Sequence, residues 1–225
     1  MRIPRIIGWI GLVLFVFTGC VDENSSVFIS HSSIFEFDEN AGCFASPDAR
    51  LARAELNVAY SDNSYEMAAV VVSQLVRRNI VTTAEPNGLY IRRFEVELTD
   101  ENGARLVDTY SVTPSGGGYI PPSPLGGSER AVFAITLIPS GVTSLLQDYV
   151  EPGGELGVIA SIRAFGRTTG GTEIESASFD YGLKLVHDEE NARVYCPAIT
   201  DPVDLGIMNC VSGQDGFPYL IARCN

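Results

Sequence analysis

Cysteine and histidine have the most versatile side-chain chemistry, and this chain has few of either. It has 225 residues, with two histidines, His31 and His187. The five cysteines are Cys20, Cys43, Cys196, Cys210 and Cys224. The absence of CxxC and HExxH motifs argues against a zinc site. A Ser-His-Asp hydrolase needs a placed histidine, and no GxSxG motif accompanies either one. We therefore predict no catalytic residue, no metal site and no cofactor.

Three acidic clusters could bind calcium or hydrolyse glycosides. They are Asp38-Glu39, Asp100-Glu101 and Asp188-Glu189-Glu190. None has the alternating DxDxDG spacing of a calcium loop. A glycosidase pair is defined by the distance between its two carboxylates in space, which sequence spacing does not give. All three clusters fall where turns are expected, so we interpret them as solvated turns.

The charge balance excludes one class of partner. Lys and Arg number 15 against 28 Asp and Glu, a formal charge of −13. Nucleic-acid binding depends on neutralising phosphates with a basic face, so we predict no nucleic-acid partner. Arg77-Arg78 and Arg92-Arg93 are the two basic pairs. They could together form an anion site, although solvated side chains that lie along a sheet are the simpler interpretation.

Residues 1–19 are typical of a signal peptide. Arg2 and Arg5 precede an uncharged apolar stretch over residues 6–17, followed by Phe17-Thr18-Gly19-Cys20. The stretch is shorter than the roughly 20 residues that a membrane-spanning helix needs. An ordinary secretory signal would place a small residue where Phe17 stands.

Phe17-Thr18-Gly19-Cys20 resembles the lipobox of bacterial lipoproteins, with Phe17 in place of the family's leucine. The resemblance implies cleavage before Cys20, acyl chains on this cysteine, and a membrane partner reached through them. Val21, rather than Asp, follows the cysteine, which in this family favours the outer membrane. Cleavage would leave 206 residues with a net charge of −15. So acidic a chain is repelled by anionic lipid, so the folded part is not expected to touch the bilayer.

The other four cysteines form an even set in an oxidising compartment, which predicts two disulfides. Cys210 and Cys224 flank a short segment with Gly and Pro that favours doubling back. This pairing leaves Cys43 with Cys196, and Cys196–Cys210 is the alternative pairing.

From about residue 27 on, apolar and polar residues alternate along much of the chain. In the strand over 90–98, the pattern places Tyr90 and Arg92 on the face of Phe94, Val96 and Leu98. Residues 66–77 are predicted to form a strand, with a helix as the alternative. A short helix is expected around 140–150, with Ser140 as its N-cap. The remaining predicted strands are 27–37, 54–60, 106–112, 131–138, 156–165 and 173–186.

Seven or eight strands without a βαβ rhythm predict an all-β protein. An antiparallel β-sandwich of the immunoglobulin or fibronectin-III type is favoured over an up-and-down barrel. The expected division is a signal peptide over 1–19, a lipidated tether over 20–26, the β-sandwich over 27–186, and a Cys-containing tail over 187–225 packed on the sandwich. The pattern is similar to the uncharacterised β-sandwich lipoproteins of GC-rich Gram-negative bacteria. This likeness rests on the segments 65–75, 94–98, 166–171 with the strand after it, and 210–215.

A Gly- and Pro-rich loop over 114–127 is the candidate contact segment, because it also carries Tyr119, Ile120 and Leu125. A disordered flap is the alternative. The sequence thus predicts a lipid-anchored, non-enzymatic envelope protein with an interaction domain and an unidentified envelope protein as possible partner. A hydrolase with carboxylate chemistry and a carrier of lipid or another hydrophobic ligand are the alternatives.

Overall fold

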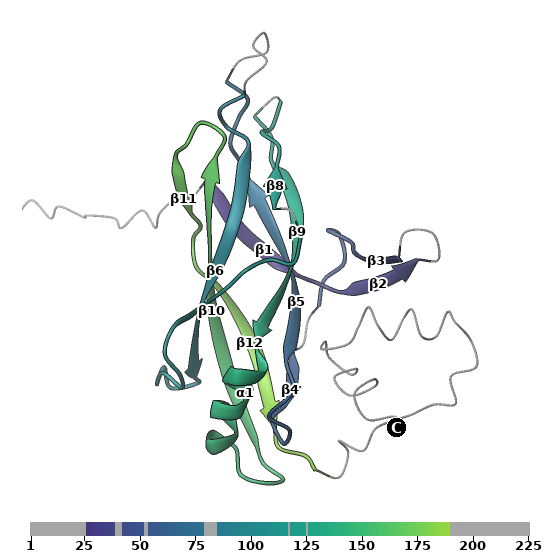
Figure 1. Ribbon diagram of the computed structural model, residues 1–225, viewed down its shortest axis with the longest axis vertical. Coiled ribbons are helices and arrows are strands. Elements are labelled where there is room, and N and C mark those ends of the chain that lie inside the picture. Colours follow the sequence, from purple (N-terminus) through teal and green to yellow (C-terminus); the bar gives the residue numbers. More distant parts are fainter. Residues whose placement is uncertain are drawn as a thin grey trace, which may run out of the picture.

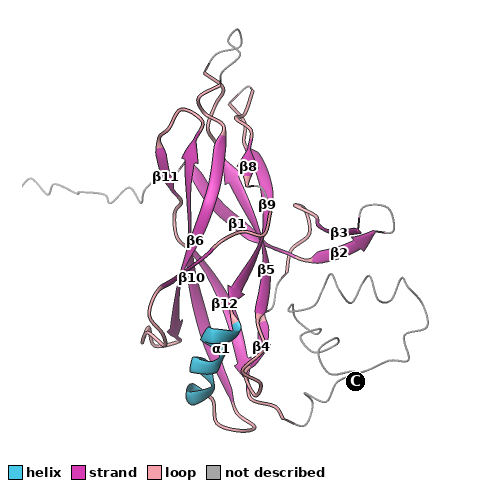
Figure 2. Ribbon diagram, in the orientation of Figure 1, coloured by secondary structure: helices cyan, strands magenta, loops and turns pink. Residues whose placement is uncertain are grey.

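The chain forms an all-β structure with one short helix, as the alternation predicts (Figure 2). A computed structural model describes residues 26–38, 42–51, 54–78, 85–116, 118–124 and 126–189. Their strands form two large sheets and a separate hairpin, which together make an elongated molecule (Figure 1).

The smaller sheet has three antiparallel strands in the order β1-β5-β9. These are β1 (Val27–Ser33), β5 (Tyr65–Ser73) and β9 (Glu129–Ile138). β5 is the segment for which a helix was the alternative. Its run of valines fits the middle of a sheet, where β-branched side chains pack against both neighbouring strands.

The larger sheet follows the order β4-β12-β10-β6-β7, with β8 paired to β6 and β11 paired to β10. Its ladders are antiparallel except that β4 runs parallel to β12. The predicted strand over 173–186 is two strands, separated at residues 176–178. The strands are β4 (Glu55–Asn57), β6 (Leu89–Asp100), β7 (Tyr110–Val112), β8 (Tyr119–Ile120), β10 (Glu155–Thr168), β11 (Glu173–Glu175) and β12 (Phe179–Val186).

One hydrophobic core lies between the two sheets. The rings of Phe94 on β6 and Phe133 on β9 are 6.0 Å apart, and both side chains are buried. The hydroxyls of Tyr65 on β5 and Tyr181 on β12 lie 2.9 Å apart, so the polar ends of these buried rings are satisfied across the sheets. Burial of a large apolar side chain contributes about 1.5–3 kcal/mol, which makes this layer the main source of stability.

A separate hairpin is inserted between β1 and β4. It consists of β2 (Phe35–Asp38) and β3 (Gly42–Ala45), and it projects from the body of the molecule (Figure 1). The turn after it crosses the outer face of the smaller sheet. Nε2 of His31 lies 3.1 Å from the carbonyl oxygen of Pro47, and Arg130 pairs with Asp48 at 2.8 Å. His31 and Arg130 stand on the two outer strands, so the turn spans the sheet.

The helix α1 (Ser140–Leu146) and a 3₁₀ turn (Gln147–Tyr149) connect the smaller sheet to the larger one. Pro139, and not Ser140, is the N-cap, because the helix begins one residue earlier than the serine cap requires. Leu146 is buried, but Leu145 is 55% and Tyr149 49% exposed. The 3₁₀ turn winds by three residues per turn, which rotates Tyr149 off the face that a continuous α-helix would bury.

A β-bulge at Arg92 corrects the predicted faces of β6. Phe165 on β10 is opposite Arg93, and the next residue, Gly166, is opposite Ile91, so Arg92 is an extra residue. The bulge changes the phase of alternation, so Leu89 and Ile91 are buried along with Phe94. Tyr90 and Arg92 therefore face solvent. A Cβ at Gly166 would lie 2.5 Å from the carbonyl oxygen of Tyr90, so the bulge needs a glycine opposite it.

Candidate functional site

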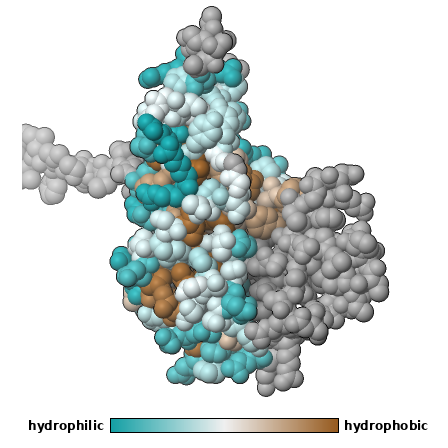
Figure 3. Space-filling view, in the orientation of Figure 1, coloured by the Kyte–Doolittle hydropathy of each residue, from teal (hydrophilic) through white to brown (hydrophobic). Residues whose placement is uncertain are grey.

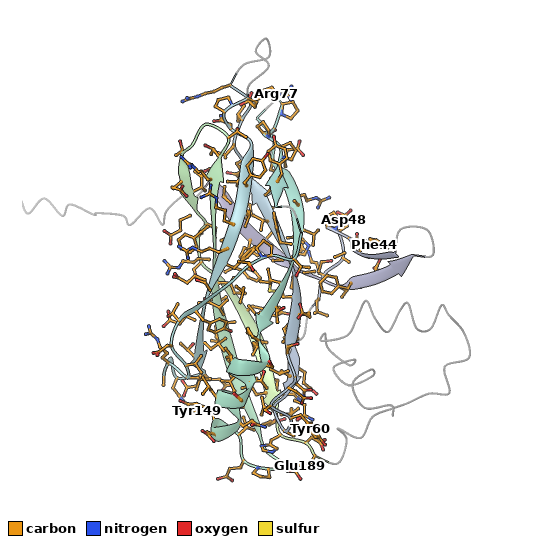
Figure 4. All side chains as sticks on the ribbon, viewed as in Figure 1. Phe44, Asp48, Tyr60, Arg77, Tyr149 and Glu189 are labelled. Carbon is orange, nitrogen blue, oxygen red and sulfur yellow. The ribbon has the colours of Figure 1, made fainter. Side chains whose placement is uncertain are left out.

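Both sheets contribute to one end of the molecule, here called the Val27 end (upper end of Figure 1). Val27 pairs with Ser73 at the end of β5. Backbone hydrogen bonds of 2.9 Å then join the following Leu75 and Arg77 to Ser123, just after β8. β8 pairs with the start of β6, which pairs with the end of β10. Arg77 lies at this end, and Tyr60, Tyr149 and Glu189 lie at the opposite one (Figure 4).

A row of four side chains crosses the larger sheet at the Val27 end. In the order of the strands it consists of Tyr119 on β8, Tyr90 on β6, Arg167 on β10 and Glu173 on β11. The two tyrosine rings are 4.9 Å apart, with 48% of Tyr90 and 43% of Tyr119 exposed. Together with Arg92, the two tyrosines and Arg167 are called the Tyr–Arg surface below.

The arginines of this surface are held by weak, exposed contacts. Glu173 lies between them, 3.8 Å from Nη1 of Arg92 and 3.5 Å from Nε of Arg167. Nε of Arg167 also donates to the carbonyl oxygen of Gly171 over 2.9 Å. Exposed ion pairs at such distances contribute little, so an incoming anion can replace Glu173 at small cost.

The tyrosines stand on rigid backbone. Amides of the turn after β10 donate 2.7 Å hydrogen bonds to the segment before β6, Thr169 to Gly88 and Gly170 to Pro86. A Cβ at Gly88 would overlap the ring of Tyr119, so only glycine lets this ring lie against the backbone. An open depression of about 610 Å³ lies beside the row, lined by residues 90–92 and 167–171.

The predicted contact loop is in part a strand. Tyr119 is exposed, but Ile120 is fully buried and belongs to the core, because β8 joins the larger sheet through it. Leu125 lies outside the described residues. Tyr90 was missed, since unbroken alternation places it in the core. The sequence signal of the bulge is the spacing of the apolar residues, which is two positions from Leu89 to Ile91 and three from Ile91 to Phe94.

The cysteine predictions lie outside what the structure describes. Cys20, Cys196, Cys210 and Cys224 fall beyond the described residues. Cys43 is placed in β3 only as backbone. The lipidation site and both disulfides, Cys43–Cys196 and Cys210–Cys224, therefore stay predictions, as does the packing of the tail.

The two histidines have separate surroundings. His31 contacts the turn after β3, whereas Nδ1 of His187 lies 2.8 Å from the carbonyl oxygen of Val150. Within the described ranges, no group of three His, Cys, Asp or Glu side chains could hold a metal ion. Asp100 caps the turn after β6, and Glu101 is exposed in this turn.

Among the described residues, two carboxyl groups have clearly shifted pKa values. Burial raises the pKa of Glu66, and a hydrogen bond from Thr136 partly opposes this shift. The amide of Ala104 lowers the pKa of Asp100 by donating to Oδ1 over 2.8 Å. Glu66 lies on β5 and Asp100 on β6, in different sheets, so they do not form a catalytic pair.

The outer face of the larger sheet is a network of ion pairs. Arg163 bridges Glu95 and Glu175, and Arg105 pairs with Glu97 at 2.7 Å. The guanidinium of Arg93 lies 3.9 Å above the ring of Phe165. In the view of Figure 3 the surface is mainly hydrophilic, with hydrophobic patches in its middle and lower parts.

No protein-family model matches the chain, and no curated protein matches it. Among the described residues, no helix has both the length and the apolar character needed to cross a bilayer.

Proposed function

We propose that this chain is a lipid-anchored, non-enzymatic protein of the cell envelope, attached to the outer membrane through acyl chains on Cys20. The support is the order of Arg2 and Arg5, an uncharged stretch and Phe17-Thr18-Gly19-Cys20. Each buried CH₂ of an acyl chain contributes about 0.8 kcal/mol, so two or three chains hold a protein essentially permanently.

The folded part is, in this proposal, an immunoglobulin-like domain. In that fold, strands A, B and E face strands G, F and C. The smaller sheet, β1-β5-β9, follows the order A-B-E, and β12-β10-β6-β7 follows the order G-F-C-C′. β4, parallel to β12, corresponds to a strand A′. This correspondence supports the immunoglobulin-like type over an up-and-down barrel.

The observation that carries an interaction role is the Tyr–Arg surface. Tyrosine and arginine are enriched where proteins make contacts, because they offer large contact areas and directional polar groups. Here they project from three strands, so contact costs little ordering entropy. The shifted carboxyls lie in different sheets, and buried apolar side chains fill the space between the sheets. We therefore propose neither a hydrolase nor a hydrophobic-ligand carrier.

The test of the anchor is the incorporation of labelled fatty acid. In cells fed labelled palmitate, the wild type is expected to carry the label, and Cys20→Ser is expected to lose it and stay uncleaved. Cys224→Ser is the matched control, because it makes the same chemical change at a cysteine not proposed to be acylated. Full labelling of Cys20→Ser would refute the proposal.

A further inference from the structure

We propose that the Tyr–Arg surface, together with Arg77 and Arg78, contacts the phosphate layer of the membrane that anchors the chain. The ligands are lipid phosphates, and the domain stands on the bilayer with its Val27 end down. This inference rests on the proposed acylation of Cys20.

The short tether limits how far the folded domain can lie from the membrane. Cys20 precedes Ser26 by six positions, so even a fully extended chain spans only about 20 Å between them. β10 alone has 14 residues, or roughly 45 Å at 3.3 Å per residue. β1 begins at the Val27 end, so that end is held next to the bilayer. The opposite end can approach lipid only if the domain lies on its side.

Charge is distributed unevenly between the two ends of the molecule. Four exposed arginines, Arg77, Arg78, Arg92 and Arg167, lie at the Val27 end with the partly buried Glu85 and Glu129 and the exposed Glu173. The opposite end has Lys184 and seven exposed carboxylates: Glu55, Asp62, Glu101, Asp148, Glu151, Glu155 and Glu189. Anionic lipid attracts basic groups near its surface and repels carboxylates. On the side of the larger sheet, Glu95, Glu97 and Glu175 are paired with Arg163 and Arg105, so this side offers anionic lipid no excess of positive charge that would favour the lying orientation.

The arginine and tyrosine side chains at the Val27 end have the chemistry to contact lipid phosphates. A guanidinium offers several N–H donors in a planar fork that matches two phosphate oxygens. Arg92 and Arg167 are about half exposed. Their one carboxylate partner is Glu173, at 3.5–3.8 Å, which lipid phosphate can displace, while Nε of Arg167 also donates to the carbonyl oxygen of Gly171. Tyr90 and Tyr119 present amphipathic rings beside them, the residue type enriched at membrane interfaces.

The overall charge does not oppose this contact. The charge of −15 expected after cleavage predicts repulsion only if it is spread evenly over the surface. The fold separates it, so the end nearest the anchor is the least acidic part of the described chain, although the tether itself adds Asp22 and Glu23 beside the membrane. Repulsion of the rest from anionic lipid then helps to keep the domain upright.

A single introduced tryptophan can test the orientation, because the only native one, Trp9, leaves with the signal peptide. Tyr90→Trp places the reporter on the Tyr–Arg surface, and Tyr149→Trp is the matched control at the other end. The two native tyrosines are 48% and 49% exposed. Each acylated full-length variant is reconstituted into vesicles of phosphatidylethanolamine and phosphatidylglycerol, with or without phosphatidylcholine brominated near the headgroup.

In brominated vesicles the Tyr90→Trp emission is expected to fall about twofold, since its ring lies at the interface. The Tyr149→Trp emission is expected to stay unchanged. Adding Arg92→Ala and Arg167→Ala to Tyr90→Trp should relieve much of the quenching. Adding Arg105→Ala, which removes an arginine from the side of the sheet, should not.

The readouts separate failure of the anchor from failure of the inference. Absence of acyl mass on Cys20 and of co-flotation with vesicles would refute the proposed function, and this inference with it. Co-flotation without quenching of Tyr90→Trp would overturn the inference alone and leave the anchor standing. Equal quenching of both reporters would show a domain lying on its side, which also overturns it.

Discussion

Asp100 stabilises the turn after β6 with its charge. Its Oδ1 accepts hydrogen bonds from the amides of Asn102 and Ala104, at 2.9 and 2.8 Å. The Ala104 contact is the main reason that the pKa of Asp100 lies below its ordinary value. The ionised form is therefore favoured by folding.

Asp100→Asn is expected to destabilise the protein near neutral pH and to have no effect in acid. A lowered folded-state pKa gives stability that is present above the unfolded-state value, about 4, and is lost as pH falls through the folded-state value. Urea unfolding of both proteins at pH 7 and pH 2 measures this. A difference in unfolding free energy that is unchanged at pH 2 would contradict the prediction.

For Glu66 we expect the opposite dependence of stability on pH. Burial raises its pKa, so the folded state holds a proton more tightly than the unfolded state does. The cost of ionising the buried group is fully present above the folded-state pKa and disappears below the unfolded-state value, about 4. Glu66→Gln should therefore stabilise the protein at pH 8 and leave stability unchanged at pH 3.

The measurement for Glu66 is the unfolding free energy at these two pH values. Glu101→Gln is the control, because Glu101 is exposed in a turn. A loss of stability in Glu66→Gln at pH 8 would show that the hydrogen bond from Thr136 outweighs burial.

At the scale of the elements, the bulge at Arg92 decides which residues the sheet exposes. Deleting Arg92 would restore unbroken alternation and turn Leu89 and Ile91 outward with Tyr90 inward. Exposing two buried aliphatic side chains costs roughly 3–6 kcal/mol. Arg92→Ala keeps the bulge and should change stability by less than about 0.5 kcal/mol. Equal urea midpoints for the deletion and the substitution would refute this reading of the strand.

The strands themselves could be predicted from the sequence because alternation is a local property. The valine run of β5 and the alternation in β9 each carry enough signal within one strand. The bulge was not predicted, because the wider spacing between Ile91 and Phe94 identifies an extra residue only against the register of β10. The burial of Ile120 was missed for a similar reason. A two-residue strand is defined by its partner, and the Gly and Pro around it indicate a loop.

At the scale of the molecule, the net charge follows from the composition, but the separation of basic from acidic side chains between the two ends does not. That separation depends on which strands end together, which is a property of topology. Arg77, Arg92 and Arg167 are distant in sequence and lie at the same end of the molecule because β5, β6 and β10 have termini there. From the sequence, Tyr119 was predicted as a contact residue, and Arg77, Arg78 and Arg92 entered only through the less favoured possibility of an anion site. Tyr90 and Arg167 were not predicted.

The folded part is expected to be independent of its anchor. A chain that starts at Asn24 keeps every described strand and the whole core, so it should be soluble and monomeric with a β-rich far-UV circular dichroism spectrum. A predominantly helical spectrum, or assembly of this chain in analytical ultracentrifugation, would contradict the prediction.

The arrangement of β1 has a mechanical consequence. β1 begins at the Val27 end, whereas β12 finishes at the opposite end. If the chain is anchored at Cys20 as proposed, a force that pulls the opposite end away from the membrane runs along the axis of β1 and tends to slide it past β5. In this shearing geometry the backbone hydrogen bonds from Val27 to Ser33 bear the load together, whereas a strand peeled from one end breaks them one at a time. Anchored as proposed, the domain would resist tension between the membrane and its opposite end.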